Sequence, residues 1–386
     1  MTPAARIAAA IDVLDQIATG DAAERVLTRW ARQNRYAGSK DRAAVRDHVF
    51  DVLRIRRTAA HLGSGTSGRQ LMIGLLRAQG VEPASMFTGK GHAPAPLGPE
   101  EAAPPIGAAS GADDWNIPDW LMDRFKDSLG PKAEPTARAL QSRAPVTLRL
   151  NRAKTDTTKA TNALALEGIE TTPNPLSETA LTVVSGERRI RQSQAYTTGL
   201  VELQDASSQA VVDLLPKADR ALDYCAGGGG KALAMAARFG NTVFAHDVDP
   251  KRMTDIPERA RRAGASIQRL TTDQTAKEGP FDLVLCDAPC SGSGAWRRSP
   301  EGKWSLNRQK LNDLTDIQDN VLETAKPLVK QGGLLVYATC SVLNCENEQR
   351  VQRFLDANKA WQCILEKQFD VSPLGDGFYT AHLTIA

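Results

Sequence analysis

The chain reads ALDYCAGGGGKALAMAARFGNTVFAHD from Ala221 to Asp247. Residues 220–224 predict a short strand, four glycines follow at 227–230, and a helical pattern continues to residue 239. A second strand is predicted at residues 242–245. Gly227, Gly229 and Ala232 have the spacing G-x-G-x-x-G/A, which lets the backbone approach a ligand where a strand gives way to a helix. This stretch therefore predicts a ligand-binding strand–loop–helix–strand unit.

Acidic residues after the next two strands narrow the class of ligand. Asp247 ends the second strand, where a carboxylate can accept hydrogen bonds from both hydroxyls of a ribose, and Asp273 follows a third, where it can face an adenine edge. A P-loop is excluded because Cys225 stands at the position of its first glycine and Ala232 replaces its Ser or Thr. We expect an adenosyl ligand. The glycine loop alone leaves open whether it is a nicotinamide or flavin dinucleotide or S-adenosylmethionine.

Strand and helix patterns alternate from residue 206 to the C-terminal end. Further strands are predicted at residues 266–270, 281–286 and 334–338, and the tail at 377–385 alternates like a strand that can close the sheet antiparallel. Such alternation indicates a doubly wound, mostly parallel sheet with helices on both faces. The predicted fold class of residues 206–386 is therefore α/β and Rossmann-like.

The rest of the chain divides into three parts by composition. Residues 1–88 carry apolar positions at helical spacing with short loops, which predicts an all-α bundle. Residues 89–117 are rich in proline and glycine and lack an apolar period, which predicts a linker or long surface loop. Residues 118–205 mix strand and helix patterns, which predicts a small α/β segment. Over residues 143–159 this segment sets a single acid, Asp156, against Arg143, Arg149, Arg152, Lys154 and Lys159. We expect this basic segment to hold RNA phosphates.

Two thiols end neighbouring core strands of the predicted sheet. Asp287-Ala-Pro-Cys290 follows the strand at 281–286, and Cys340 follows the strand at 334–338. Hydride transfer needs no such pair of thiols. Methylation of a pyrimidine at C5, in contrast, needs a thiolate that adds to C6 and a second group that promotes release of this thiolate afterwards. Asp287 can hydrogen-bond N3 or the exocyclic amine of a cytosine and stabilise the charge that develops. The spacing leaves open which thiol attacks.

Taken together, these motifs resemble those of the cytosine-C5 RNA methyltransferases of the Sun/Fmu type (the RsmB/NOP family), which modify small-subunit ribosomal RNA in bacteria. The resemblance rests on QDASSQ at 204–209, CAGGGGK at 225–231, DAPCSG at 287–292, RRSPE at 297–301, Trp304, TCS at 339–341, ENE at 346–348 and DGF at 376–378. It covers residues 117–386 well. The N-terminal helices loosely resemble the NusB-like RNA-binding domain of that family.

The resemblance implies a class I methyltransferase domain that uses S-adenosylmethionine and acts on RNA. It makes Cys340 the nucleophile and Cys290 the residue that assists release, with Asp287 beside them. The cofactor-binding residues that it implies are Cys225, Ala226, Gly227, Gly228, Gly229, Gly230, Lys231, Asp247, Asp273 and Asp287. No metal is expected. Gly228 and Ala232 depart from the usual proline and threonine of the family, and a glycine at 228 still permits the same backbone path.

A second basic run lies between the two thiol motifs. Its cations are Arg297, Arg298, Lys303, Arg308 and Lys310. We expect them to contact RNA phosphates, because this run borders the predicted target pocket. Trp296 and Trp304 could stack on bases or serve as packing anchors.

Composition bounds the remaining possibilities. The 386 residues hold 48 Lys and Arg against 45 Asp and Glu, and 41% of them are apolar, which excludes a wholly disordered chain. No run approaches the roughly 18 apolar residues of a membrane span, and the six cysteines accompany no secretory signal. We expect reduced thiols, a cytoplasmic location and a monomer.

The expected function is methylation of C5 of a cytosine in RNA, with 16S ribosomal RNA as the leading substrate. Two alternatives are a transfer-RNA methyltransferase with the same chemistry and a non-catalytic RNA-binding or ribosome-assembly factor that keeps the fold.

Overall fold

The computed structural model describes residues 1–103, 105, 107 and 109–385, which form two compact units by their contacts. The helical unit comprises Met1–Lys126, Pro131–Arg143 and Trp296–Leu306. The sheet unit comprises Asp127–Gly130, Ala144–Ala295 and the chain from Asn307 onward. The boundaries predicted at residues 88, 117 and 205 stay predictions. By their contacts, residues Trp296–Leu306 also belong to the helical unit, although they lie in the C-terminal half of the sequence. Among the described residues, no helix has the length and apolar character needed to cross a membrane.

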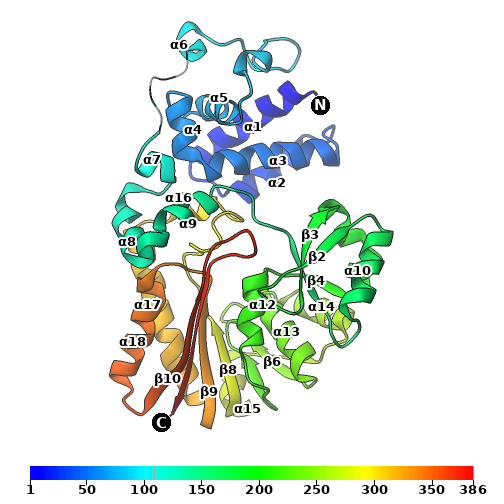
Figure 1. The fold of residues 1–386 in the computed structure, drawn as a ribbon, viewed down its shortest axis with the longest axis vertical. Helices are drawn as coiled ribbons and strands as arrows, with labels where there is room; N and C mark the ends of the chain where they lie inside the picture. Colours follow the sequence, from blue (N-terminus) through cyan, green and yellow to red (C-terminus); the bar gives the residue numbers. More distant parts are fainter. Residues whose placement is uncertain (104, 106, 108, 386) are drawn as a thin grey trace. The chain divides into compact units, whose positions relative to one another are not determined.

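The N-terminal helices pack around an apolar core, as their spacing predicts (Figure 1). They are α1 (Pro3–Ala18), α2 (Ala23–Gln33), α3 (Ser39–Arg54), α4 (Arg56–Leu62), α5 (Gly68–Ala78) and the short η1 (Pro83–Ser85). Val13, Val45 and Ile73 are fully buried between them. Gly74 lets α5 approach α4 closely, because a Cβ at this position would stand 1.8 Å from the carbonyl oxygen of Ala59. The helical N-terminal region is thus confirmed, while its likeness to NusB stays a prediction.

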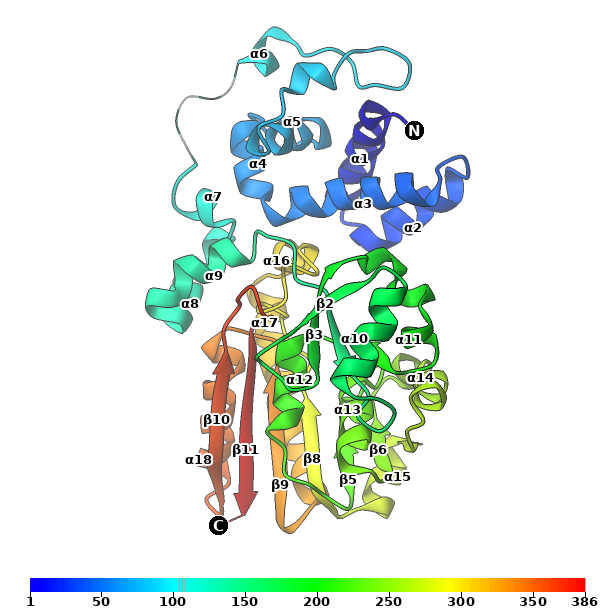
Figure 2. The same cartoon turned by 45° about the vertical axis from the view of Figure 1, so that its right-hand side comes forward.

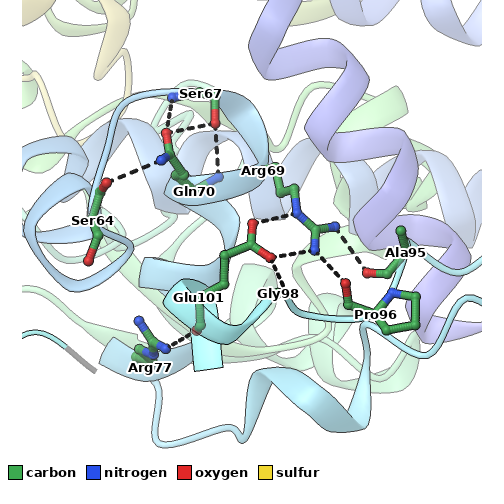
Figure 3. Close-up of polar contacts among 9 residues, drawn as sticks. All are labelled: Ser64, Ser67, Arg69, Gln70, Arg77, Ala95, Pro96, Gly98 and Glu101. Atoms are coloured by element: carbon green, nitrogen blue, oxygen red, sulfur yellow. Dashed lines mark hydrogen bonds and ion pairs between the residues drawn. The ribbon is translucent and has the colours of Figure 1, made fainter. Parts of the chain in front are cut away.

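The segment predicted as a linker or loop, residues 89–117, is anchored to the helical unit. It includes the short helices α6 (Pro99–Ala102) and α7 (Ala112–Trp115). The guanidinium of Arg69 on α5 donates to both carboxylate oxygens of Glu101, at 2.7 and 2.8 Å, and to the carbonyl oxygens of Ala95 and Pro96 (Figure 3). These hydrogen bonds from Arg69 lower the pKa of Glu101 to about 2, so the anchor stays ionised at neutral pH. Within the predicted linker, residues 104, 106 and 108 lie outside the described residues.

Three further elements continue the chain from the linker, and a distant segment completes the helical unit. The elements are α8 (Asp119–Leu129), η2 (Gly130–Lys132) and α9 (Ala133–Ala139). The distant segment, residues 296–306, includes α16 (Glu301–Ser305). Trp304 Nε1 donates to the carbonyl oxygen of Leu53 at 2.6 Å, and Lys303 Nζ donates to that of Arg54 at 3.3 Å. The segment therefore satisfies carbonyl groups at the C-terminal end of α3, which the helix leaves without partners of its own.

The prediction that the run at 297–310 contacts RNA phosphates is wrong for its two buried cations. Arg297 is 2% exposed and Lys303 is 1% exposed, and burial lowers the pKa of Lys303 to about 7. Trp296, at 1% exposed, is a packing anchor and cannot stack on a base in this structure. The exposed cations Arg298, Arg308 and Lys310 keep their predicted role as a proposal.

The smaller sheet of the sheet unit is antiparallel, with strand order β2-β3-β1-β4. Its strands are β1 (Thr147–Leu150), β2 (Glu170–Pro173), β3 (Ala180–Ser185) and β4 (Val201–Leu203). Its helices are α10 (Thr157–Leu166), η3 (Glu187–Gln192) and α11 (Gln194–Thr197). Leu148, Leu164 and Leu181 meet in its core, so these strands and helices form a small α/β layer, whereas Pro131–Arg143 of the predicted segment belong to the helical unit.

The basic cluster predicted at 143–159 does not form one patch. Arg149 is buried and donates to the carbonyl oxygen of Gly230 at 2.7 Å, and Lys154 donates to the carbonyl oxygens of two other segments. The remaining three cations pair with carboxylates: Arg143 with Asp47, Arg152 with Glu178 and Lys159 with Asp156. The expected phosphate-holding role therefore has no support in the arrangement of these five side chains.

The large sheet has the strand order β10-β11-β9-β8-β5-β6-β7 (Figure 2). Its strands are β5 (Ala221–Asp223), β6 (Val243–His246), β7 (Ile267–Leu270), β8 (Phe281–Asp287), β9 (Val329–Thr339), β10 (Trp361–Phe369) and β11 (Phe378–Ile385). The neighbouring strands β7, β6, β5, β8 and β9 run parallel, whereas β11 pairs antiparallel with β9 and β10 pairs antiparallel with β11. The doubly wound sheet and its antiparallel tail are confirmed. The edge strand β10 is an addition to the prediction.

Helices cover both faces of the large sheet. They are α12 (Ala206–Asp213), α13 (Gly230–Phe239), η4 (Pro250–Met253), α14 (Ile256–Ala263), α15 (Thr272–Glu278), α17 (Arg308–Ala325), η5 (Lys326–Leu328), η6 (Asn344–Glu346) and α18 (Glu348–Ala357). One core gathers residues of α12, α13 and α14, and the other gathers residues of α17 and α18. Starting from β5, the chain adds β6 and then β7 on one side of this strand. It then adds β8 and β9 on the other side. Ligands of such sheets bind at this reversal, outside the carboxyl ends of the strands.

Candidate active site

Parallel pairing brings the predicted site residues to one edge of the large sheet. Asp223 ends β5, Asp247 directly follows β6, Asp287 ends β8 and Cys340 directly follows β9. Because β6, β5, β8 and β9 are neighbours in that order, their carboxyl ends lie side by side. The acids and thiols chosen from the sequence therefore come from adjacent strand ends.

The glycine loop has the backbone conformation that its composition predicts. Gly227 and Gly229 have φ angles of +50° and +80°, which side-chain-bearing residues rarely adopt. A Cβ at Gly229 would also stand 2.8 Å from Cγ1 of Ile256. Gly228, which replaces the family's proline, has its carbonyl oxygen bonded by the guanidinium of Arg259. The loop is thus held by both conformation and contacts.

Asp247 is bound to the glycine loop through its carboxylate. It is 3% exposed, and its Oδ2 accepts from the backbone NH of Gly227 at 2.9 Å while Oδ1 accepts from that of Asp249 at 3.0 Å. The guanidinium of Arg252 approaches the same carboxylate at 3.1 Å. This carboxylate fixes the loop and the end of β6 in one arrangement.

His246 is a site residue whose part the sequence did not reveal. Its Nδ1 lies 2.8 Å from the carbonyl oxygen of Tyr224, its Nε2 lies 3.0 Å from Oγ1 of Thr272, and its ring stacks on that of Tyr224 with centroids 4.5 Å apart. The side chain therefore joins the ends of β5 and β6 to the start of α15. The exposed Asp273 follows Thr272 directly, so this bridge sets the position of the acid predicted to face an adenine.

A buried group of charges lies under the glycine loop. Lys231 Nζ is 2.6 Å from Oδ2 of Asp287, and the side chain of Lys231 is only 6% exposed. Burial alone would lower the pKa of Lys231, but the carboxylates of Asp287 and Asp223 outweigh it and raise that pKa. Lys231 is therefore a structural cation of the site, charged at neutral pH.

Asp223 carries an incompletely satisfied carboxylate at the centre of this group. It is 1% exposed, and its two oxygens lack a hydrogen-bond partner of good geometry among the described residues. Burial, followed by the charge of Asp287, raises the pKa of Asp223 to about 7, although Lys231 and the backbone NH of Ala232 partly oppose the shift. A ligand that brings an ammonium group would satisfy this carboxylate. The amino group of S-adenosylmethionine fits that requirement. The sequence offered one signal for Asp223, its place directly before the loop.

The two predicted thiols lie together at the other end of the site. Sγ of Cys290 is 3.4 Å from Sγ of Cys340. The hydrogen bond to Cys340, followed by burial, raises the pKa of Cys290 well above the ordinary value, so Cys290 keeps its proton at neutral pH. Burial likewise raises the pKa values of Cys225 and Cys286, which makes both unreactive. Among the described residues, no three His, Cys, Asp or Glu side chains gather as a metal site would need.

Comparison with known proteins identifies two matching sequence families. Residues 211–383 match the family described as 16S rRNA methyltransferase RsmB/F, and residues 117–188 match the ferredoxin-like domain of RsmF/B-like methyltransferases. The ribosomal RNA small subunit methyltransferases B of Yersinia pseudotuberculosis and Yersinia pestis are 31% identical to the chain over 283 residues. That match covers 69% of this chain and 66% of the Yersinia proteins, just under two thirds of their length.

Solved structures share the fold. The protein PH0851 is similar over 100% of this chain and 99% of its own, with a TM-score of 0.77 and 20% identity. A methyltransferase homologue from Pyrococcus horikoshii is similar over 71% of this chain and 97% of its own, with a TM-score of 0.61 and 21% identity. NSun6 from the same organism, solved with SFG, covers 69% of this chain and 98% of its own at a TM-score of 0.61 and 17% identity. At these identities the likeness concerns the fold alone.

Replacing Asp223 by Asn should remove the pH dependence that this carboxyl brings to folding. The pKa of Asp223 rises from 3.8 to about 7 on folding, so the folded state holds this proton more tightly than the unfolded state. The carboxyl therefore does not lower the free energy of unfolding well below pH 4, and it lowers it increasingly as the pH rises toward 7. Relative to the Asp223→Asn protein, the wild type should therefore lose thermal stability between about pH 4 and pH 7. Melting curves of both ligand-free proteins across this range measure the difference. Asp273→Asn, a change at an exposed carboxylate of the same site, should follow the wild type. A constant difference between wild type and Asp223→Asn would contradict the assignment.

Proposed function

The chain belongs to the family of 16S rRNA methyltransferases RsmB/F, and on that premise we propose that it methylates C5 of a cytosine in small-subunit ribosomal RNA. The observation that carries the proposal is the pair of thiols 3.4 Å apart at the ends of adjacent strands. Methyl transfer to oxygen or nitrogen needs no thiol, whereas C5 of a pyrimidine becomes nucleophilic only after a thiolate adds to C6. The names of the curated relatives support ribosomal RNA as the substrate.

The cofactor site is proposed on the same edge of the sheet. The loop from Cys225 to Lys231, together with Asp247 and Asp273, would hold S-adenosylmethionine, and Asp223 would pair with its amino group. When bound, S-adenosylmethionine supplies the electrophilic methyl group that C5 of the activated cytosine accepts. The main contribution of the protein is geometric, because the glycine loop lets the backbone come close to the ligand.

Cys340 is the proposed nucleophile. Its thiolate adds to C6 of the cytosine, which forms a carbon–sulfur bond and moves an electron pair toward C5. The ammonium of Lys231 lies within electrostatic range of Cys340 and attracts negative charge there. The hydrogen bond to Cys340 and burial raise the pKa of Cys290, which disfavours Cys290 as the attacking thiolate.

Cys290 is proposed to promote release of the product. Cys290 gives its proton to solvent and, as a thiolate, takes the proton from C5 after the methyl group has been transferred. The electron pair of the C5–H bond forms the C5–C6 double bond, the carbon–sulfur bond breaks, and Cys340 leaves as a thiolate.

Asp287 is proposed to orient the cytosine. Its side chain is 32% exposed although one oxygen is paired with Lys231, so it can still accept a hydrogen bond from the exocyclic amine of the base. A stacked and paired base could not reach the thiols, so we expect the target nucleotide to be single-stranded or flipped out.

Replacing Cys340 by Ala should abolish methyl transfer. Cofactor binding should stay nearly unchanged, because Cys340 follows β9 and is not part of the glycine loop at residues 225–231. Transfer of tritium from labelled S-adenosylmethionine to RNA measures the first property, and calorimetric titration with the cofactor measures the second. Methyl transfer at the wild-type rate would show that Cys340 is not the nucleophile.

Replacing Cys290 by Ala should slow release and leave a covalent complex of protein and RNA. A denaturing gel detects this complex as a band that nuclease treatment removes. If the complex forms with Cys340→Ala and not with Cys290→Ala, the two roles are reversed.

Bisulfite sequencing of cellular RNA tests the substrate directly. In a strain that lacks the gene, one cytosine of small-subunit ribosomal RNA should lose its protection from bisulfite, and the wild-type gene should restore it. Loss of protection in transfer RNA alone would show that the ribosomal assignment is wrong while the chemistry stands.

A further inference from the structure

Glu346 is a buried carboxylate that the proposed mechanism does not use. It is 0% exposed and lies in η6, the short turn that follows β9 and Cys340. An ionised carboxylate in such a place is costly unless several donors surround it. The identity of those donors therefore indicates what Glu346 does.

Both carboxylate oxygens of Glu346 accept hydrogen bonds from the segments that carry the thiols. Oε1 accepts from the backbone NH of Ser291 at 2.8 Å, and Oε2 accepts from the hydroxyl of Ser291 and from that of Ser341, the latter at 2.6 Å. Ser291 directly follows Cys290, and Ser341 directly follows Cys340. One side chain thus connects the residue after each thiol.

A third segment completes the arrangement. Gln318 of α17, also 0% exposed, donates to Oε1 of Glu346 at 3.1 Å and to the carbonyl oxygen of Pro289 at 2.8 Å. Pro289 directly precedes Cys290, so the peptide on each side of that thiol is tied to the same centre. The hydroxyls of Ser293 and Ser341 are 2.8 Å apart and close the connection between the two segments.

We propose that Glu346 is the positioning residue of the thiol pair: it holds the segments of Cys290 and Cys340 together so that their sulfur atoms stay within contact distance. The value of this arrangement for catalysis rests on the function proposed above. The hydrogen bonds that hold the two thiol segments together do not depend on that function. Glu346 touches neither thiol in this arrangement and acts through the serines that follow them.

A carboxylate suits this position better than the amide of similar size. The three groups that approach Glu346 from the thiol segments are donors, and Gln318 adds a fourth. A glutamine at 346 would keep one oxygen and place an NH₂ group at the other, where the hydroxyls of Ser291 and Ser341 would have to accept although each already accepts from a backbone NH. Each donor left without an acceptor in a buried site favours separation of the segments.

The test measures the thiol pair itself. Diamide oxidises two neighbouring thiols to a disulfide, takes up the two electrons and two protons, and becomes the hydrazine. The rate at which the Cys290–Cys340 disulfide forms, followed by mass spectrometry of the linked peptides, should fall at least about tenfold in Glu346→Gln. Glu348→Gln, two residues away on α18, is the matched control and should react at the wild-type rate.

A second readout connects the arrangement to catalysis. Glu346→Gln should lower kcat for methyl transfer at least about tenfold and leave KM for RNA within about twofold of the wild type, because the substrate-binding surface is unchanged. Cross-linking requires neither RNA nor cofactor. A wild-type protein that forms the disulfide but does not methylate RNA would therefore contradict the proposed function and leave this inference standing.

A folded Glu346→Gln protein that forms the disulfide within about twofold of the wild-type rate would overturn the proposal. If this variant does not give a cooperative melting transition, Ser341→Ala and Ser291→Ala each remove one hydroxyl arm and keep the carboxylate. Both should slow the cross-link, and wild-type rates in both would equally overturn it.

Discussion

The ion pair between Lys231 and Asp287 is the interaction on which the site depends. Parallel pairing of β5 with β8 brings the buried carboxylate of Asp223 and the partly exposed one of Asp287 to one edge of the sheet, where their like charges would oppose each other. Lys231, in the first turn of α13, supplies the compensating charge at 2.6 Å. It reaches that point because the glycine loop turns the chain back over the strand ends. Strand pairing, loop conformation and the start of α13 are thus coupled through one buried cation.

The thiol end of the site depends on close backbone packing. The chain after β8 remains paired with β9 through the hydrogen bond from Ala288 N to the carbonyl oxygen of Ala338, and Gly294 N then donates to the carbonyl oxygen of Cys340 at 2.9 Å. A Cβ at Gly294 would stand 2.2 Å from the carbonyl oxygen of Gly377, so only glycine fits there. This contact gives the DGF motif near the C-terminal end a physical reason, because it packs against the segment that carries Cys290.

Local patterns predicted those parts of the structure that local interactions determine. The strand–loop–helix unit around Gly227, the order of core strands and the strand-end positions of Cys290 and Cys340 follow from spacing and from the topology of parallel sheets. The burial of Lys303 could not be predicted, because its environment comes from helices some 250 residues earlier in the chain. Glu346 was visible only as part of a motif, since its donors come from three segments separated in sequence. Charged residues were the usual source of error, because the same lysine or arginine can face water, pair with an acid or be buried.

The helical unit is discontinuous in sequence, and this affects the order in which the protein can fold as it is synthesised. The carbonyl group of Leu53 at the end of α3 receives its donor from Trp304, a residue 251 positions later. When the ribosome has finished α1 to α5, the bundle still lacks the segment that packs on this helix end. That segment emerges only after β8 has been made. The helices made first therefore reach their final packing late.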